Sequence, residues 1–316
     1  MKLIFFIILV LSLTGVIFLN AYGEIIFSYT IGKEGTGITE FRKPIGIHID
    51  EEKIFVAEFQ NRRIQILDLD GSFESFIDLD GRPHGIGVYR DRIYVAVWAE
   101  KSHVDIFDKN GERLSKIFGF ERPGDIAMDD QGNIFVTEYD TGFIKVLDTN
   151  ENVVKRYDTL LAISNNHSEL TGITLDSSGN IYTSDYLNNK VVKLDSSGNF
   201  LMEYIVPVEE GGTFTRPTNV EIKDDEIFVT DISNKILVFR TNGDFLYSFG
   251  ESGKGDGQFS SPHGISFDES GNIYVNDYFN HRIQVFTVDD TFEKTDHETS
   301  QMDWFSELIN WIRSFF

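Results

Sequence analysis

The sequence of 316 residues contains no cysteine, only six prolines and few basic residues. Without cysteine the chain can form no disulfides and no thiolate metal sites, and it has no cysteine nucleophile. Lys and Arg number 28 against 51 Asp and Glu, and the resulting formal charge of −23 argues against a nucleic-acid partner because it repels phosphate backbones. Hydrophobic residues make up 41% of the chain and aromatic residues 14%, which is enough apolar surface for a sizeable core.

Charge is also missing from a run near the N-terminus, Leu3 to Leu19, which follows Lys2. This run is at the short end for a membrane-spanning helix and slightly long for the apolar part of a signal peptide. The small residues Ala21 and Gly23 stand where a signal peptidase would cut. We therefore expect residues 1–23 to form either a cleaved signal peptide or a retained membrane-anchor helix. The rest of the protein would then be extracytoplasmic, secreted or membrane-anchored.

A pattern with a period of about forty residues runs through most of the remaining sequence. Each repeat opens with a turn and a short apolar strand, and further strands follow after Gly-containing turns, as in Ile273-Tyr-Val-Asn276, Ile283-Gln-Val-Phe286 and Phe245-Leu-Tyr-Ser-Phe249. The intervals between openings are 39, 40, 47, 47 and 45 residues. The six openings are Pro44-Ile-Gly-Ile47, Pro83-His-Gly-Ile86, Pro123-Gly-Asp-Ile126, Leu170-Thr-Gly-Ile173, Pro217-Thr-Asn-Val220 and Pro262-His-Gly-Ile265.

Six repeats of four antiparallel strands can bury both faces of each sheet only if the sheets stack radially. The repeats therefore predict an all-β fold, a six-bladed β-propeller of four-stranded antiparallel blades. The sixth repeat has only three strands and ends near Thr287. Residues 27–44 match residues 245–262 without a gap, so the N-terminal strand is predicted to complete the last blade and to cover two exposed sheet edges.

These repeats resemble those of the NHL family, whose pattern is roughly G-x-G-x-F-x-x-P-x-G-I, then D-x-x-G-N-I-Y-V-x-D and N-x-R-I. Residues 255–283 carry the pattern most fully, whereas blade two departs from it with Val97 at the acidic position. The resemblance covers residues 24–287 and implies the propeller fold. It implies little about function, because known relatives include protein- or RNA-binding modules, sensor ectodomains and α-amidating lyases.

Acidic residues end the second strand in five of the six repeats. Repetition favours a scaffold role, in which each carboxylate accepts backbone N–H bonds from the following loop. The five residues are Glu58, Glu138, Asp185, Asp231 and Asp277. The Asp-rich turns that follow the first strands offer a weaker possibility of bound calcium, because none of them reproduces a twelve-residue calcium loop.

Two histidines, His84 and His263, follow the opening proline in repeats two and six. Blades two and six flank blade one in a closed ring, so both imidazoles are predicted to face the same channel mouth. The Pro-His-Gly-Ile opening is similar to the one from which α-amidating lyases supply zinc-binding histidines, and this likeness implies a zinc site; two ordinary loop histidines are the alternative. A lyase-type site needs a third ligand. The equivalent positions elsewhere provide none: they are Ile45, Gly124, Thr171 and Thr218.

Basic residues directly precede the opening in four repeats. In so acidic a protein, cations at one repeat position predict a locally positive rim that binds an anionic ligand. The alternative is that they bond carbonyl groups of neighbouring loops. The four residues are Lys43, Arg82, Arg122 and Arg216.

The C-terminal part of the chain is expected to differ from the repeats. Residues 288–302 are polar and charged and are predicted to form a linker. Residues 303–316 have the pattern of a short amphipathic helix, which is too short to span a bilayer. This helix would lie in a membrane interface or pack against protein.

Taken together, the sequence predicts an extracytoplasmic NHL-type propeller that acts as a binding or interaction module. A protein or a small anionic ligand would bind at the channel mouth, where loops around residues 33–43, 206–216 and 250–261 cluster. The alternative is a metal-dependent lyase or lactone-type hydrolase with its site in the central channel. Zinc and calcium are the cofactors to consider, and residues 1–23 and 303–316 are the segments that could contact a membrane.

Overall fold

The computed structural model describes residues 24–51, 53–159 and 167–289. The predicted helices at 1–23 and 303–316 lie outside the described residues, as does nearly all of the predicted linker. The chain divides into two compact units, residues 27–286 and a second unit made of residues 1–26 and 287–316. In the part of the chain that is described, no helix has the length and apolar character needed to cross a membrane.

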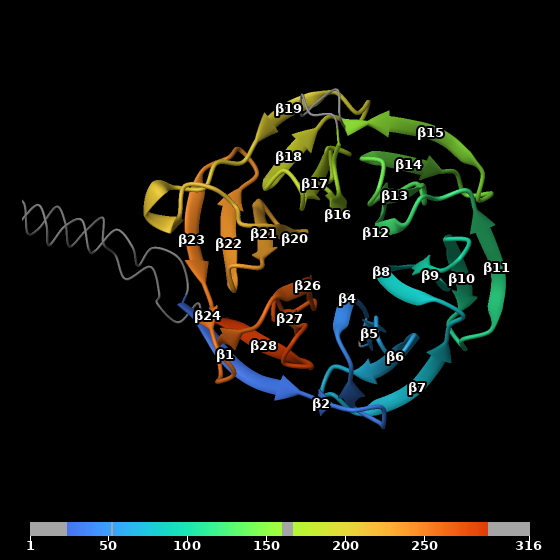
Figure 1. The fold of residues 1–316 in the computed structure, drawn as a ribbon, viewed down its shortest axis with the longest axis horizontal. Coiled ribbons are helices and arrows are strands. Elements are labelled where there is room, and N and C mark those ends of the chain that lie inside the picture. Colours follow the sequence, from blue (N-terminus) through green and yellow to red (C-terminus); the bar gives the residue numbers. More distant parts are fainter. Residues whose placement is uncertain (1–23, 52, 160–166, 290–316) are drawn as a thin grey trace, which may run out of the picture. The chain divides into compact units, whose positions relative to one another are not determined.

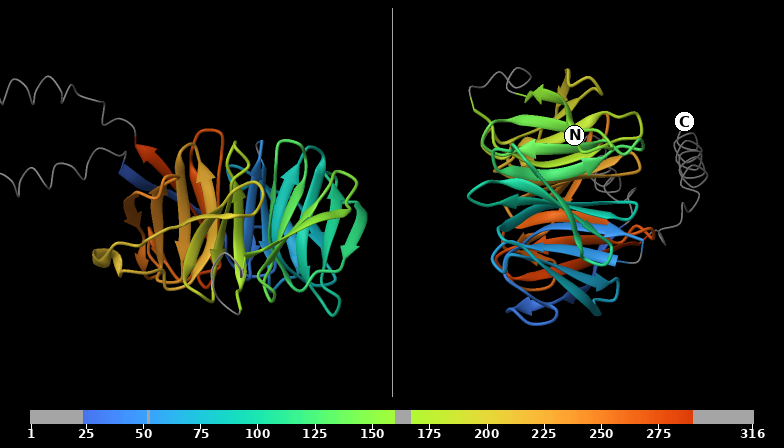
Figure 2. Two further views of the ribbon diagram at one scale, coloured as in Figure 1. Left: turned by 90° about the horizontal axis from the view of Figure 1, so that it is seen from above. Right: turned by 90° about the vertical axis from the view of Figure 1, so that its right-hand side faces the viewer.

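Within the described residues, the strands build six four-stranded sheets around a central axis (Figures 1 and 2), which confirms the predicted six-bladed propeller. Blade one consists of β4 (Pro44–Asp50), β5 (Lys53–Glu58), β6 (Arg63–Asp68) and β7 (Phe73–Asp78). Blade two consists of β8 (Arg82–Tyr89), β9 (Arg92–Trp98), β10 (His103–Asp108) and β11 (Arg113–Phe118). Blade three consists of β12 (Pro123–Met128), β13 (Ile134–Glu138), β14 (Phe143–Leu147) and β15 (Val153–Asp158).

The second half of the ring has the same order from the axis outward. Blade four consists of β16 (Leu170–Leu175), β17 (Ile181–Asp185), β18 (Lys190–Leu194) and β19 (Phe200–Glu203). Blade five consists of β20 (Pro217–Lys223), β21 (Glu226–Asp231), β22 (Lys235–Arg240) and β23 (Phe245–Phe249), and a short 3-10 helix, η2 (Val208–Glu210), precedes it. Blade six consists of β26 (Pro262–Phe267), β27 (Ile273–Asp277), β28 (Arg282–Asp289) and, from the other end of the chain, β1 (Glu24–Ile31).

Polar side chains shape the hairpin turns between first and second strands. In blade four the carboxylate of Asp176 accepts hydrogen bonds from the backbone N–H groups of Ser178 and Asn180, both at 2.9 Å. Gly179 has a φ of +77°, a left-handed conformation that favours glycine. The Asp-x-x-Gly-Asn pattern is therefore explained by turn formation, since the carboxylate is occupied by its own hairpin.

The N-terminal strand closes the ring, as the internal match predicts. The order of the last sheet is β1-β28-β27-β26, so the first strand of the propeller is the outer strand of blade six. Phe27 of β1 packs edge to face on Phe286 of β28, with ring centroids 6.0 Å apart. Phe245 makes the equivalent contact with Phe239 in blade five at 5.3 Å. The two matching segments thus occupy the same place in neighbouring blades.

Short parallel pairs follow both matching strands. Lys33 of β2 (Lys33–Glu34) pairs with Glu40 of β3 (Glu40–Phe41), and β24 (Glu251–Ser252) pairs in the same way with β25 (Gln258–Phe259). Each pair carries the chain from an outer strand back to the axis. The core lies between neighbouring blades, where for example Phe41 of β3 and Ile54 of blade one pack with Tyr274 of blade six.

We predict that the closing strand contributes to the stability of the whole ring. Ile31 of β1 is buried, with 4% of its surface exposed, and it packs in the core cluster between blades six and one. Ile31→Ala should lower the free energy of unfolding by about 2–4 kcal/mol because it leaves a cavity. Urea denaturation would measure this change. Ile26→Ala on the same strand is the control, because Ile26 is 39% exposed and its truncation should cost less than about 0.5 kcal/mol. Equal effects of the two substitutions would contradict this role of the strand.

Candidate functional site

The inner strands of the propeller leave little space between them at the third residue of each opening. A Cβ atom at Gly85 would lie 2.4 Å from the Cα of Asp125, and one at Gly172 would lie 2.7 Å from the Cα of Asn219. Glycine is therefore required where neighbouring openings approach so closely. Four of the six repeats have glycine at this position, and only Asp125 and Asn219 carry side chains there. We call this level of the channel the neck.

The two side chains at the neck meet across the channel. The amide Nδ2 of Asn219 in blade five donates a hydrogen bond to the Asp125 carboxylate in blade three at 2.9 Å, and the backbone N–H of Ile173 in blade four donates to the same oxygen at 3.3 Å. Burial raises the pKa of Asp125 to about 7. Two residues after Asn219 on the same strand, Glu221 accepts a hydrogen bond from Thr174 Oγ1 at 3.0 Å, and burial likewise raises the pKa of Glu221 to about 7.

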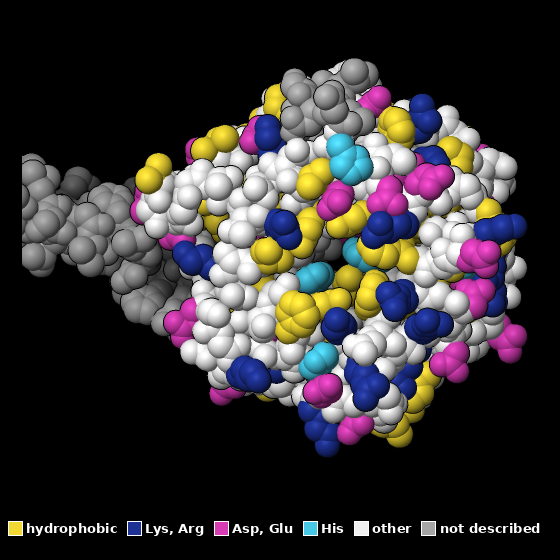
Figure 3. Space-filling model, in the orientation of Figure 1, with side chains coloured by type: hydrophobic (Ala, Val, Ile, Leu, Met, Phe, Trp, Pro, Cys, Tyr) yellow, Lys and Arg dark blue, Asp and Glu magenta, His cyan; other side chains and the backbone are white. Residues whose placement is uncertain are grey.

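Above the neck lies a cavity of about 170 Å³, which we call the mouth cavity. It is lined by Asp125 and Asn219 below and by His84 and His263 on its wall. Figure 3 shows this end of the propeller, with histidines at the central hollow and hydrophobic and basic side chains around it. The prediction that both imidazoles face one channel mouth is therefore confirmed.

Both histidines are stacked on an aromatic ring of their own blade. The His84 ring lies on Trp98 with centroids 4.5 Å apart, and the His263 ring lies on Tyr278 at 4.3 Å, each pair within 19° of parallel. Burial, and then the charge of His263, lowers the pKa of His84 to about 3, while burial lowers the pKa of His263 to about 4. Both imidazoles are therefore neutral at physiological pH.

The four predicted rim cations gather around the same mouth, and each lies over an aromatic ring of the preceding blade. Arg122 is the most enclosed, with its guanidinium carbon 4.2 Å from the Trp98 ring centroid and 4.8 Å from that of Tyr139. The other distances are 5.1 Å for Arg82 over Phe59, 5.1 Å for Arg216 over Tyr186 and 5.4 Å for Lys43 over Tyr278. Cation–π contacts thus hold all four cations, and Arg216 also donates a hydrogen bond to the Tyr186 hydroxyl at 3.4 Å.

The aromatic members of this rim were missed in the sequence, although they share one repeat position. Each of them directly follows the position of the repeated acidic residue, which is Val97 in blade two, and only Ile232 in blade five departs from the pattern. The five aromatic residues are Phe59, Trp98, Tyr139, Tyr186 and Tyr278. We call these five and the four cations the aromatic–cation rim. Two of the predicted loops, 33–43 and 206–216, end at its members Lys43 and Arg216.

The repeated acidic residues have the structural role that was predicted, but most of their partners lie in a different loop. Glu58 and Asp277 are fully buried. Glu58 accepts the backbone N–H of Arg42 at 3.3 Å, and Asp277 accepts that of Ser260 at 2.8 Å. These donors lie in the segment before the first strand of the blade, whereas the prediction placed them in the loop after the second strand. The carboxylates thus hold the segments that lead to the rim.

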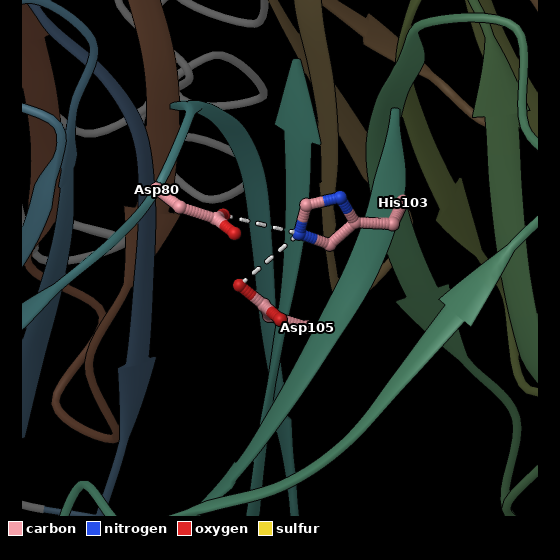
Figure 4. Close-up of side chains that lie close together, drawn as sticks. All are labelled: Asp80, His103 and Asp105. Carbon is pink, nitrogen blue, oxygen red and sulfur yellow. Dashed lines mark ion pairs between the residues drawn. The ribbon is translucent and has the colours of Figure 1, made fainter. Parts of the chain in front are cut away.

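Blade two replaces this arrangement with a different charge cluster (Figure 4). Val97 of its second strand stands where the other blades have the acidic residue, and a buried carboxylate lies on the third strand instead, at Asp105. The Nε2 atom of His103 lies 3.3 Å from Asp105 and 3.5 Å from Asp80. Burial lowers the pKa of His103, but its hydrogen bonds to Asp105 and the Lys101 carbonyl outweigh this and raise it above the usual value.

Among the described residues, Asp80, His103 and Asp105 form the one group of three whose ligand atoms are spaced for a metal ion. The ammonium of Lys116 already pairs with Asp80 and lies 3.3 Å from His103 Nε2. Arg113 Nε lies 3.2 Å from Asp105. Since protein cations occupy this cluster, it serves blade two as a structural ion-pair network.

Comparison with known proteins supports the NHL likeness. A family model, DUF5128, described as a 6-bladed beta-propeller, matches residues 163–308. NHL repeat-containing protein 3 of Homo sapiens is 31% identical over 81 residues, which are 24% of this chain and 23% of that protein. Protein brain tumor of Drosophila melanogaster is 26% identical over 147 residues, which are 42% of this chain and 14% of that protein. The chain thus spans less than a quarter of each of these relatives.

Solved structures share the fold at low sequence identity. Virginiamycin B lyase from Staphylococcus aureus, in a catalytically inactive form with quinupristin, has a TM-score of 0.60 and 19% identity, over 84% of this chain and 86% of that chain. At this identity the likeness concerns the fold alone. The sequence matches and the structure together confirm the predicted likeness to NHL-type six-bladed propellers.

The zinc site at His84 and His263 stays a prediction that metal analysis of the purified full chain would test. Neutral imidazoles are the form that binds zinc. If the pair holds the metal, dialysis against zinc should leave one zinc per chain, and the double variant His84→Ala, His263→Ala should lose it. His103→Ala is the matched control and should leave the zinc content unchanged. Absence of zinc from the folded wild-type protein would contradict the prediction.

Proposed function

We propose that this propeller of NHL-type repeats is a binding module whose mouth cavity takes an anionic ligand with an apolar body. The observation that carries the proposal is the aromatic–cation rim. Four cations at one repeat position, three of them arginines, lie over aromatic side chains that line one cavity, in a chain whose formal charge is −23. A local positive region on so acidic a protein attracts anions and orients them toward the mouth.

The rim holds its cations in place while leaving them able to bind. The side chains of Arg82, Arg122 and Arg216 belong to exposed residues, and an aromatic ring supports one face of each guanidinium. Of the described carboxylates, only Asp140 forms an ion pair with the rim, to Arg122 at 2.9 Å. Guanidinium groups fixed in this way present N–H donors in the geometry that carboxylates and phosphates accept.

The apolar part of the ligand would contact the aromatic side chains of the mouth. Phe59, Tyr139 and Tyr186 line the cavity together with Trp98 and Tyr278. With a volume of about 170 Å³ the cavity is smaller than typical drug-sized sites, which favours a small molecule or a single protruding side chain of a protein partner.

A metal-dependent lyase or lactone-type hydrolase is the second candidate function. It is favoured by one observation, the two neutral imidazoles that share the mouth cavity. The zinc analysis of His84 and His263 separates the two candidates, because the binding module needs no metal.

The proposed location is outside the cytoplasm, because the uncharged run from Leu3 to Leu19 is typical of export or anchoring. Protease added to intact producing cells should then degrade the propeller. A propeller that survives protease until the cells are lysed would contradict the extracytoplasmic location.

Truncation before Asp303 should release the protein from the membrane fraction if residues 303–316 anchor it.

Removal of rim charge should weaken the binding of a small aromatic anion. We would use 3-phenylpropanoate as the probe, measured by isothermal titration calorimetry at pH 7. The double variant Arg82→Gln, Arg122→Gln should bind the probe about thirtyfold more weakly, if each lost charged contact is worth about 1 kcal/mol.

The matched control is Arg156→Gln, because Arg156 also lies over an aromatic ring, Phe143 at 4.1 Å, but on the outer strand of blade three. Its affinity should stay within a factor of two of the wild type. The proposal is wrong if the rim variant and the control bind equally well, or if the wild-type protein does not bind the probe.

A further inference from the structure

We propose that three arginines beside the mouth cavity, Arg62, Arg82 and Arg122, form a site for the phosphate group of a phosphate monoester. They line a hollow of about 480 Å³ at the loops of blades one to three, which we call the arginine pocket. The proposal rests on the proposed function, because it names the anionic group of the ligand. It also adds a residue to the site, since Arg62 is not a member of the aromatic–cation rim.

The arginine pocket adjoins the mouth cavity. Phe59 and Trp98 line both hollows. The space-filling view shows basic side chains gathered beside the central hollow on this face (Figure 3). A phosphate in the arginine pocket can therefore belong to the same ligand whose apolar part contacts the aromatic side chains of the mouth.

Contacts with one tryptophan hold two of the arginines at this pocket. Arg82 of β8 pairs with Trp98 of β9, and a Cβ atom at Gly81 would lie 2.6 Å from the Trp98 carbonyl oxygen. The Trp98 indole N–H donates to the Pro123 carbonyl at 2.7 Å, and the Arg122 guanidinium carbon lies 4.2 Å from the Trp98 ring centroid. A tryptophan fixed in this way keeps both arginines at the same pocket.

Arg62 belongs to the pocket from the side of blade one. Its carbonyl accepts the backbone N–H of Leu79 at 2.9 Å, in the segment that leads to Arg82. Arg62 has a φ of +56°, in the left-handed region that glycine and asparagine favour. The residues directly before the third strand of blades three to six also have a left-handed backbone, and they are Gly142, Asn189, Asn234 and His281. The turn therefore does not require an arginine, and a function of the guanidinium explains its presence.

The three guanidinium groups are able to bind an anion. All three arginines are exposed. Among the described carboxylates, Asp140 alone forms an ion pair with one of them, through Nη1 of Arg122. Each guanidinium has five N–H donors in a planar arrangement that fits the oxygen atoms of a phosphate.

Two acidic residues also line the pocket, and they differ in how their charge is compensated. Asp80 forms an ion pair with Lys116. Glu100 is exposed, and no cation in the described part of the chain forms an ion pair with it. Three guanidinium groups thus share the pocket with one uncompensated carboxylate. This excess of positive charge favours a dianion over a monoanion, and a phosphate monoester is a dianion above its second pKa of about 6.

A matched pair of probes tests for the dianion. Phenyl phosphate and phenyl sulfate have the same ring and a similar tetrahedral group, but at pH 8 their charges are about −2 and −1. By calorimetry at constant ionic strength, the full chain should bind phenyl phosphate at least about tenfold more tightly than phenyl sulfate. Equal affinities would overturn the phosphate site.

The Arg62→Asn variant removes one cation and keeps the turn, because Asn189 and Asn234 hold the equivalent position with a left-handed backbone. It should bind phenyl phosphate about tenfold more weakly than the wild type, which is the loss expected for one charge-assisted hydrogen bond. Arg90→Asn is the matched control. Arg90 is also exposed and has a φ of +53°, but it follows β8 at the opposite end of that strand from Arg82. Its substitution should change the affinity by less than about twofold, and equal effects of the two variants would contradict the role of Arg62.

The substitution Glu100→Gln should have the opposite effect. It removes the uncompensated carboxylate from the lining, so phenyl phosphate should bind about fivefold more tightly. A gain in affinity cannot result from partial unfolding, so this variant makes the test independent of stability. Unchanged or weaker binding would contradict the arginine pocket as the site.

A small phosphate ester and a phosphotyrosine side chain of a protein partner share this chemistry. The capped tripeptide Ala-phosphotyrosine-Ala distinguishes them. Binding of the tripeptide at least about tenfold more tightly than phenyl phosphate would assign the site to a protein partner, because peptide backbone then adds contacts. Equal or weaker binding would assign it to a small ester.

The outcomes also separate this proposal from the proposed function. If 3-phenylpropanoate binds through the rim but phenyl phosphate is not preferred over phenyl sulfate, the phosphate site is wrong and the anion-binding mouth stands. If none of these three probes binds, both proposals are wrong.

Discussion

The narrowness of the neck is the constraint on which the candidate site depends. Six inner strands converge there, and the space between neighbouring openings is too small for a Cβ atom at Gly85 or Gly172. Side chains are present in only two repeats, and their hydrogen bond, from Asn219 to Asp125, crosses from blade five to blade three. The Asp125 carboxylate lies among the residues that line the mouth cavity, and the four cations lie over aromatic rings of the same lining.

The fold could be predicted from the sequence because each of its determinants is local and repeated. Openings such as Pro44-Ile-Gly-Ile47, the Asp-x-x-Gly-Asn turns and the short β-branched strands recur at a steady interval. The match of residues 27–44 to residues 245–262 was enough to predict ring closure. Blade position also placed His84 and His263 at one mouth, because residues at one repeat position in a closed ring face the same end.

The rest of the site depends on contacts between different repeats. The interval at which a sequence repeats does not reveal such contacts. In blade two, Val97 replaces the repeated acidic residue, and Asp105 on the third strand supplies the buried carboxylate. The sequence pattern does not connect these two residues. Asp125 and Asn219 are likewise departures from glycine, separated by 94 residues in the chain, and only the closed ring brings them together. The aromatic rim could have been found in the sequence, because Trp98 and Tyr278 share a repeat position, but hydrophobic residues after a strand are usually part of the core.

The closing strand has a consequence for the making of the protein. β1 leaves the ribosome first, but its partner β28 begins about 250 residues later. At a synthesis rate of roughly 5–20 residues per second, the first strand waits roughly 13–50 s for its partner. During that time its backbone N–H and C=O groups are unpaired, and so is the outer edge of the unfinished ring. Chaperones that shield such edges during synthesis or export therefore matter more for this chain than for a domain whose strands pair with their neighbours in sequence.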